Sequence, residues 1–398
     1  MSFEGYSEAT RTLYEGHKIK GMDLMPEAFP LFNTTAFNMG DLNDVHKTYE
    51  EKGYTYVRTR NPNRAALAEM ISFLEKGKQT LIFSSGMGGI TTTYLSLLNP
   101  GDHFICNSYI YGETFDAINQ LLRKFSVEVD FVDFTNLELV KAAIRPNTKM
   151  LYTEVVSNPT DIVVDIEGLA NIAHQTEAWL MVDNTFTTPL AIKPMLLGAD
   201  IVLNSLTKFM NGHSDALAGS ITVNDESLYE RIHEIRMLTG TSASPHTAWT
   251  VFKGMQTVHL RVNKQMENAA KLAKALEENP IVLKVNHPSI KSNPQNELAN
   301  QMFKDDNHMT GMLSFDMPDD KDKINEFMNR LQLAHYAPTL GGIRTTLSHP
   351  LHSSHHHVPK EEREKMGISY GTMRVSCGIE DSVDLIKDFM YALEVFQQ

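Results

Sequence analysis

The stretch that decides the fold is residues 199–215, which read Ala-Asp-Ile-Val-Leu-Asn-Ser-Leu-Thr-Lys-Phe-Met-Asn-Gly-His-Ser-Asp. Its first part predicts an apolar strand that ends at Asn204. Small hydroxyl residues then flank Lys208, and an Asn-Gly pair marks a turn shortly afterwards. A lysine just past the end of a buried strand is poorly explained as a solvated surface charge. We therefore interpret Lys208 as a candidate Schiff-base lysine.

The composition indicates a globular protein that acts on a small molecule. With 398 residues, 42% of them hydrophobic, the chain is long enough for two domains with a large core. A formal net charge of -13, without a long Lys/Arg cluster, argues against nucleic-acid and anionic-membrane partners. Neither a signal-peptide pattern nor a stretch of ~18 apolar residues occurs. The two cysteines do not resemble a disulfide framework, so we expect a cytoplasmic protein.

Apolar strands alternate with helical segments between residues 63 and 204. Short connections join them, which predicts an α/β fold with a mainly parallel sheet covered by helices on both faces. The strands are expected at 80–84, 103–107, 127–132, 150–155, 179–182 and 200–204, and the helices at 63–76, 90–98, 114–124, 137–144 and 166–175.

The pattern of apolar residues changes at two places along the chain, which predicts an N-terminal arm and two domains. Residues 1–60 have little apolar periodicity and read as an N-terminal arm. Residues 61–255 contain the alternating segments and form the large domain. A long helical pattern after Met255 opens a smaller C-terminal α/β domain, residues 256–398, with candidate strands at 282–285 and 311–315 and candidate helices at 320–331 and 383–396.

Polar residues gather where the predicted strands end. In parallel sheets, ligands bind beyond the carboxyl ends of the strands. The residues Ser85-Gly-Met-Gly-Gly89 join a strand to a helix, which suits either an anion site at the helix N-terminus or merely tight packing. An aspartate at a strand end, such as Asp183, is also a common helix cap. Together these ends present Ser85, Gly86, Met87, Tyr111, Asn158, Asp183, Ser205, Thr207 and Lys208.

Five histidines lie within residues 349–357, at positions 349, 352, 355, 356 and 357. This density raises the hypothesis of a metal site. No carboxylate or cysteine stands at ligand spacing beside them, and Pro350 within the segment and Pro359 just after it make this part of the chain loop-like. We therefore expect a structural or substrate-adjacent loop and predict no metal site.

Pyridoxal 5'-phosphate (PLP) needs an amine for its aldehyde, a carboxylate for its ring nitrogen, a stacking ring and a phosphate cradle. The sequence contains the motifs Ser205-Leu-Thr-Lys-Phe-Met-Asn-Gly-His-Ser-Asp215, Asp183-Asn-Thr185, Ser85-Gly-Met87, Tyr56-Val-Arg58, Tyr111-Gly112 and Arg374-Val-Ser-Cys-Gly378. With these motifs it closely resembles, from about residue 27 to the C-terminus, the Cys/Met-metabolism family of PLP enzymes, which includes γ-lyases and γ-synthases. The resemblance implies a fold-type I PLP-transferase fold with a seven-stranded type of sheet.

The resemblance implies a role for each matching residue. Lys208 would bind the cofactor and shuttle protons, and Asp183 would pair with the pyridinium nitrogen. Tyr111 would stack on the ring and assist catalysis, while Arg374 would bind the substrate α-carboxylate. Further cofactor contacts would come from Gly86, Met87, Asn158, Ser205 and Thr207, and from Tyr56 and Arg58 of a neighbouring subunit. The implied assembly is a homotetramer, a dimer of dimers with shared active sites.

Two departures from the family pattern bear on the substrate. Glu113 stands where methionine γ-lyases carry a cysteine, and Thr339-Leu-Gly-Gly-Ile-Arg344 replaces a Ser-Leu-Gly-Gly segment that is followed by an acidic residue. Glu113 and Arg344 either pair with each other or adapt the site to a substrate with a charged distal end. We include Thr339, Glu113 and Arg344 with Arg374 as candidate substrate-binding residues.

The resemblance and the chain length favour γ-elimination from a sulfur-containing or other γ-substituted amino acid. The products would be 2-oxobutyrate, ammonia and a thiol. A γ-replacement synthase, of the cystathionine γ-synthase or O-acetylhomoserine sulfhydrylase type, is the alternative. A PLP-binding regulatory protein without catalysis is a remote third hypothesis.

Overall fold

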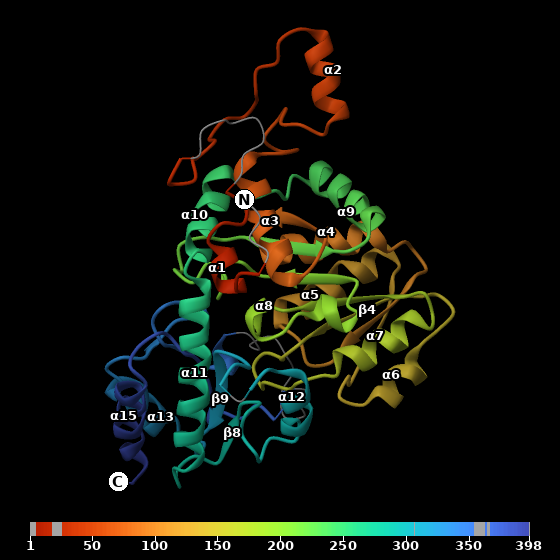
Figure 1. Ribbon diagram of the computed structural model, residues 1–398. Helices are drawn as coiled ribbons and strands as arrows, with labels where there is room; N and C mark the ends of the chain where they lie inside the picture. The colour runs from red at the N-terminus through yellow and green to blue at the C-terminus, as the bar shows by residue number, and fades with distance from the viewer. Residues whose placement is uncertain (1–4, 18–25, 306, 354–362, 364–366, 398) are drawn as a thin grey trace.

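Two sheets organise the computed structural model, which describes residues 5–17, 26–305, 307–353, 363 and 367–397 (Figure 1). Within these residues the larger sheet has seven strands, in the order β1 (Gln79–Phe83), β7 (Gly219–Val223), β6 (Ile201–Asn204), β5 (Trp179–Asp183), β4 (Thr148–Glu154), β2 (His103–Asn107) and β3 (Glu128–Val132). Strand β7 is antiparallel to both of its neighbours, and the other pairs are parallel. The predicted fold class is confirmed.

Helices cover both faces of this sheet. The described α-helices are α1 (Glu8–Thr12), α2 (Leu42–Glu50), α3 (Pro62–Glu75), α4 (Gly86–Leu97), α5 (Gly112–Gln120), α6 (Leu137–Ala143), α7 (Ile166–His174), α8 (Thr188–Ala191), α9 (Glu226–Thr239), α10 (Pro245–Met255), α11 (Val258–Glu277), α12 (Asn296–Met302), α13 (Lys321–Arg330) and α15 (Ser382–Leu393).

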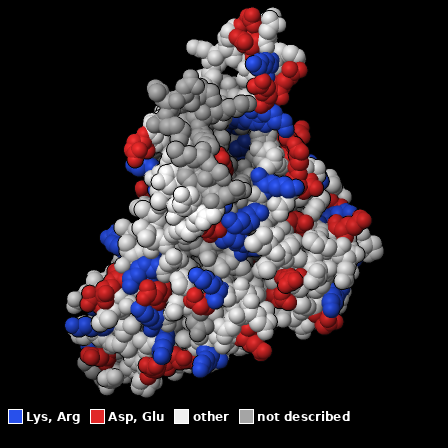
Figure 2. Space-filling model, viewed as in Figure 1, with Lys and Arg blue, Asp and Glu red and all other residues white. Residues whose placement is uncertain are grey.

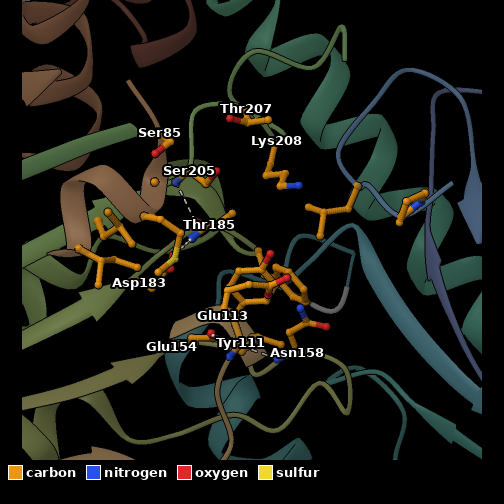
Figure 3. A pocket seen from close by; sticks show the side chains of 18 of the residues that line it. Ser85, Tyr111, Glu113, Glu154, Asn158, Asp183, Thr185, Ser205, Thr207 and Lys208 are labelled. Atoms are coloured by element: carbon orange, nitrogen blue, oxygen red, sulfur yellow. Dashed lines mark hydrogen bonds between the residues drawn. The ribbon is translucent and has the colours of Figure 1, made fainter. Parts of the chain in front are cut away.

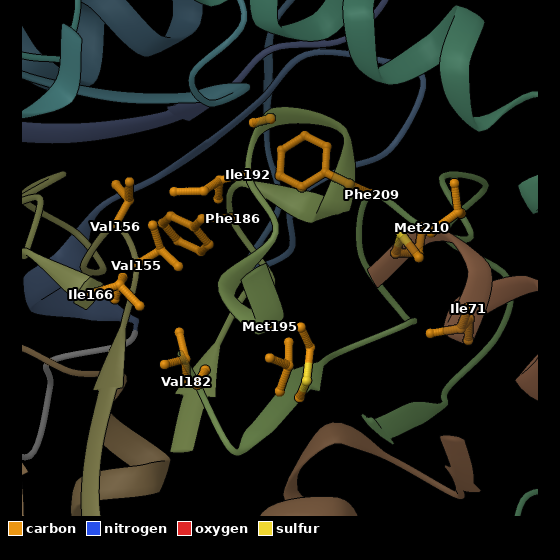
Figure 4. Close-up of a cluster of buried hydrophobic side chains, with 14 of the residues drawn as sticks. Ile71, Val155, Val156, Ile166, Val182, Phe186, Ile192, Met195, Phe209 and Met210 are labelled. Carbon is orange, nitrogen blue, oxygen red and sulfur yellow. The ribbon is translucent and has the colours of Figure 1, made fainter. Parts of the chain in front are cut away.

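Successive residues of the buried strands point into different cores because side chains alternate across a sheet. On β4, Leu151 joins the cluster that includes residues of α3, α7 and α10, part of which is shown in Figure 4. Met150 and Tyr152 join the cluster on the other face, with residues of α4 and α9. Because both faces are buried, the edge formed by the strand ends is where polar side chains remain accessible.

The second sheet lies in the C-terminal part of the chain. Among the described residues its order is β10 (His335–Tyr336), β11 (Thr346–Ser348), β12 (Thr372–Ser376), β9 (Met312–Asp316) and β8 (Lys284–Asn286). Helix α11 runs from the large sheet to this smaller one (Figure 1). Helices α13 and α15 cover the smaller sheet, where Phe315, Phe327 and Phe389 form one aromatic cluster. This arrangement suits the proposed division into residues 1–60, 61–255 and 256–398.

Some element boundaries differ from the expectation. Helix α4 begins at Gly86 instead of residue 90 because Ser85 is its N-cap, accepting a hydrogen bond from Gly88 N at 2.9 Å. The glycine-rich turn is therefore the first turn of the helix. Strand β7 was not expected from the sequence, and it closes the large sheet between β6 and β1.

The histidine-rich segment is described only in part, since residues 355–357 lie outside the described residues. His349 is buried, and its Nε2 lies 2.8 Å from Tyr370 O. Its ring also contacts those of His352 and Tyr370. Within the described ranges, no cluster of three or more His, Cys, Asp or Glu side chains has the arrangement of a metal site.

Charged side chains of both signs are interspersed over the face shown in Figure 2. No helix among the described residues has the length and apolar character needed to span a membrane.

A buried acid ties α3 to the strand ends beside Lys208. Glu75 is fully buried, and its Oε1 accepts hydrogen bonds from Asn184 Nδ2 at 3.0 Å and Asn204 Nδ2 at 2.6 Å. Its Oε2 has no hydrogen-bond partner. Burial raises the pKa of the Glu75 carboxyl from 4.5 to about 7, although both asparagines oppose the shift.

Glu75 is therefore expected to make stability depend on pH. Between about pH 4.5 and about pH 7 the folded protein binds a proton that the unfolded chain has released, so its stability falls as the pH rises through this window. Above it the loss amounts to about 3 kcal/mol at most. Glu75→Gln does not titrate, so its thermal unfolding midpoint relative to the native protein should rise by about 2–5 °C between pH 5 and pH 8. The exposed Glu234→Gln is the control, and parallel pH profiles for all three proteins would contradict the assignment.

Candidate active site

A cavity of about 370 Å³ lies at the carboxyl ends of the large sheet, where β12 of the second sheet closes it. This volume suits a small ligand. The side chain of Lys208 reaches into it from one side, and Tyr111, Glu113 and Asn158 face it from the other (Figure 3). The site therefore combines residues from the ends of several strands, as expected for an open α/β sheet.

Lys208 is held by the short segment that follows β6. Its backbone N–H donates to Ser205 O at 3.1 Å, and the Thr207 hydroxyl accepts from Ala218 N at 3.1 Å. Burial, followed by the positive charge of Arg374, lowers the pKa of the Lys208 amine below its usual range. A larger fraction of this amine is then uncharged at neutral pH, which is the form that attacks a carbonyl.

The lysine segment is fixed against the second sheet and α11. Gly341 has a φ of +77°, and a Cβ atom there would lie 2.3 Å from Phe209 N. Arg261 Nη1 on α11 donates to Phe209 O at 2.9 Å, and Gln265 Nε2 on the same helix donates to Gly342 O at 2.7 Å. One helix thus holds both the lysine segment and the loop that touches it.

The N-terminus of α4 forms an anion site beside Lys208. A Cβ atom at Gly86 would lie 3.1 Å from Ser205 Cβ, and one at Gly219 would lie 2.4 Å from Ser85 O. Glycine therefore allows these segments to approach closely. The free N–H groups of the first helical turn, including that of Met87, together with the hydroxyls of Ser205 and Thr207 at the cavity wall, suit a phosphate.

Two acids, Asp183 and Glu154, also line the cavity. Asp183 Oδ1 accepts from Thr185 N at 2.9 Å, and its Oδ2 accepts from Tyr152 OH at 3.4 Å. Glu154 accepts from Tyr111 N at 2.7 Å and from Asn158 N at 3.1 Å. Burial raises the pKa of both acids, and the charge of Asp183 raises that of Glu154 further. A protonated ring nitrogen beside Asp183 would relieve this pair by supplying a positive charge.

Arg374 on β12 supplies a guanidinium to the wall of the cavity. Its Nη1 donates to Asn158 Oδ1 at 3.0 Å, and its Nη2 donates to Thr339 O at 3.4 Å. Burial lowers its pKa to about 10, which still leaves it charged at neutral pH. Asp161, which lies near Arg374, is completely buried. Neither of its carboxyl oxygens accepts a hydrogen bond of normal geometry. Burial raises the pKa of Asp161, and Arg374 opposes that shift.

Comparison with known families decides the identity of this site. The family described as Cys/Met metabolism PLP-dependent enzymes matches residues 10–394. The chain belongs to this family. As a Cys/Met-metabolism enzyme it uses pyridoxal 5'-phosphate as its cofactor.

Curated relatives of this Cys/Met-metabolism enzyme have more than one activity. An L-methionine γ-lyase of Fusobacterium nucleatum subsp. polymorphum is 37% identical, over 92% of this chain and 93% of the relative. A cystathionine γ-lyase of Bacillus subtilis is 38% identical, over 87% and 90%. A cystathionine β-lyase of Lactococcus lactis subsp. cremoris is 38% identical, over 92% and 93%.

A solved structure adds a synthase to the activities found among similar proteins. The cystathionine γ-synthase of Xanthomonas oryzae pv. oryzae has a TM-score of 0.92 and 28% identity, and the match covers 98% of this chain and 99% of that one. Fold and cofactor are therefore shared by lyases and a synthase, and the side chains around the substrate must separate them.

The cavity fits the cofactor that the family requires. It brings together an amine, a carboxylate with a raised pKa, a helix N-terminus that suits phosphate and the aromatic ring of Tyr111. On this basis we propose that Lys208, Asp183 and Tyr111 have the roles inferred from the sequence. Eleven residues that the sequence singled out line the cavity: Ser85, Gly86, Met87, Tyr111, Glu113, Asn158, Asp183, Ser205, Thr207, Lys208 and Arg374.

Four of the sequence-predicted residues do not line the cavity. Thr339 contributes its carbonyl oxygen to Arg374 instead. Tyr56 is 47% exposed on the N-terminal arm, and Arg58 Nη1 donates to Met237 O at 2.8 Å. Arg344 is exposed on the turn that leads into β11 and is not among the residues that line the cavity. Of the two alternatives for Glu113 and Arg344, their mutual ion pair is not formed in the described part of the chain.

Proposed function

We propose that this enzyme catalyses γ-elimination from a sulfur-containing or other γ-substituted amino acid, giving 2-oxobutyrate, ammonia and a thiol. The observation that carries the proposal is the placement of Lys208 and Tyr111 on opposite sides of one cavity (Figure 3), which Arg374 also lines. A base, an acid and a carboxylate clamp are the groups that this reaction requires. Relatives named methionine γ-lyase and cystathionine γ-lyase support it.

Arg374 would bind the substrate α-carboxylate. A guanidinium presents two parallel N–H donors, which match the two oxygens of a carboxylate. Asn158 and the Thr339 carbonyl hold this guanidinium in place. The α-carbon of a bound amino acid would therefore face Lys208, and its side chain would extend towards Tyr111 and Glu113.

Lys208 and Tyr111 would move the protons. The bound cofactor withdraws electrons from the substrate, which makes its Cα and Cβ protons acidic. The Lys208 Nζ atom, whose pKa is lowered by burial, accepts them. Burial, followed by the neighbouring Glu113, raises the pKa of the Tyr111 hydroxyl well above its usual value. Tyr111 thus keeps a proton that it can donate to the departing sulfur.

Two other reactions have support of their own. A γ-replacement synthase would use the same groups but add a thiol, and the similarity to cystathionine γ-synthase favours it as the alternative. A β-lyase would break the other carbon–sulfur bond of cystathionine, and the cystathionine β-lyase at 38% identity favours this candidate. A non-catalytic regulatory role has no such support, because Lys208, Asp183 and Arg374 all line one cavity.

Product analysis separates these reactions. The holoenzyme would be incubated with cystathionine, methionine, homocysteine and O-acyl-homoserines, with and without a thiol. We expect 2-oxobutyrate, accompanied by cysteine when the substrate is cystathionine. Pyruvate with homocysteine would indicate β-elimination, and a thioether formed only from an O-acyl-homoserine and a thiol would indicate a synthase. Either outcome would overturn γ-elimination as the main activity.

We also propose that the active site is shared between subunits of a homotetramer built as a dimer of dimers. Tyr56 and Arg58 lie on the N-terminal arm outside the cavity of their own chain. The arm, with α2, projects away from the body of the molecule (Figure 1), and no residue of α2 is buried. Exposed aromatic and cationic groups on a projecting arm suit contact with a second subunit. Light scattering tests this assembly, and a fully active monomer would contradict it.

A further inference from the structure

Glu113 is the feature of the cavity that the proposed reaction leaves unexplained. It is the second residue of α5, and its exposed side chain lines the cavity beside Tyr111 (Figure 3). An acid in the first turn of a helix is stabilised by the helix dipole. The helix dipole explains why an acid stands at this position. It does not explain why the Glu113 side chain lies at the cavity wall, because a carboxylate that pointed away from the cavity would be stabilised by the dipole to the same degree.

The Glu113 carboxylate is hydrogen-bonded to the Tyr111 hydroxyl, which is neutral, so this contact does not compensate its charge. Glu154 accepts two backbone hydrogen bonds, and Asp183 is held by Thr185 and Tyr152. Within the described residues, no lysine, arginine or histidine forms an ion pair with Glu113. The cavity wall thus presents a carboxylate without a cation.

The position of Glu113 identifies which part of a substrate meets it. Arg374 and Lys208 supply the positive charges near the α-carboxylate and the α-carbon, and the negative charge of Glu113 raises the pKa of both. The space beside Tyr111 and Glu113 remains for the distal end of the substrate side chain. A carboxylate at this point attracts a cation and repels an anion.

We propose that Glu113 is a specificity-determining residue that selects amino acids whose side chain ends in a cationic group, such as an ammonium, and disfavours those that end in an anion. This inference rests on the proposed function, since it assumes that an amino acid binds with its carboxylate at Arg374. It favours a substrate whose distal end carries an ammonium, as that of cystathionine does beside a carboxylate, over an O-acyl-homoserine whose tail carries a carboxylate alone.

Binding of three unreactive amino acids tests the proposal without requiring turnover. L-Lysine, L-norleucine and L-2-aminoadipate have similar chains that end in a cation, a methyl group and an anion, and none carries a γ leaving group. Calorimetric titration of the holoenzyme should give the affinity order lysine, norleucine, 2-aminoadipate, with about a tenfold difference between the first and the last. Raising the ionic strength should reduce this difference.

Variants identify the group responsible. In Glu113→Gln the affinities for lysine and 2-aminoadipate should agree within about twofold, because the amide keeps the shape but not the charge. Asp116→Asn, on the same helix but outside the cavity wall, should keep the native preference. Equal affinities in the native enzyme, no binding of lysine, or a preference that survives in Glu113→Gln would overturn the proposal. Failure of the proposed γ-elimination would appear separately, as absence of 2-oxobutyrate in the product analysis.

Discussion

Replacing Lys208 by alanine is expected to lower the rate of 2-oxobutyrate formation by about 10⁴-fold. The side chain reaches into the cavity opposite Tyr111, and its lowered pKa makes it the available base. Alanine removes both the base and the amine that attaches the cofactor. The loss should therefore appear in kcat, which is measured from the initial rate of oxoacid formation at saturating substrate.

A second measurement separates chemistry from folding. Borohydride reduction followed by mass spectrometry should find the cofactor mass on the peptide that contains Lys208 in the native protein, and on no corresponding peptide of Lys208→Ala. Lys141→Ala is the matched control, because Lys141 is exposed on α6 and pairs with Glu138. If Lys208→Ala retained the native rate, the assignment of the catalytic lysine would be wrong.

Replacing Arg374 by alanine should raise KM for amino-acid substrates by about 100-fold, with a smaller change in kcat. The guanidinium is buried, so a substrate carboxylate that meets it loses water but gains two charge-assisted hydrogen bonds. Without Arg374 that carboxylate would be buried against Asn158 and the uncompensated acid Asp161. Initial-rate kinetics over a wide substrate range would measure the effect.

Arg344→Ala is the natural comparison for Arg374→Ala. Both arginines were candidates for substrate binding on sequence grounds, but only Arg374 lines the cavity. We expect Arg344→Ala to leave KM and the order of substrate preference unchanged. A shift in preference among charged substrates would show that Arg344 reaches the distal group after all.

The sequence predicted the parts of the site that depend on local order along the chain. Strands that alternate with helices bring their carboxyl ends to one edge, which predicts that Ser85, Asp183 and Lys208 lie together. The lysine segment was recognisable because a charged residue directly after an apolar strand has few structural explanations. These inferences need only periodicity and strand direction, which the sequence contains.

The residues that sequence reasoning missed depend on packing between distant segments. Glu154 ends an apolar strand and Glu75 lies near a helix end, where acids are ordinarily solvated. Asp161 comes two residues after Pro159, so from sequence it reads as a turn residue, and its φ is +53°. Each becomes a buried acid only because another element covers it. The choice between Arg344 and Arg374 likewise depends on how the second sheet meets the first.

Strand β7 is an element of the fold that sequence reasoning missed for the same reason, because it depends on pairing between distant segments. It is short, begins with glycine and follows a loop, so its apolar content did not distinguish it from a connection. Its pairing with both β6 and β1 is a long-range property. The position of Gly219, whose missing side chain admits the backbone of Ser85, is visible only when the two segments are seen side by side.

The contact at Gly341 makes the two halves of the active site mechanically inseparable. The backbone of Gly341 lies close to the backbone of Phe209. Arg261 and Gln265 of α11 donate hydrogen bonds to Phe209 and Gly342, one in each of the two segments. The position of the second sheet, which carries Arg374, is therefore coupled to that of the segment that carries Lys208. An engineer who transplants the substrate clamp of a relative into this enzyme must transplant the lysine loop and the facing turns of α11 with it, as a single part.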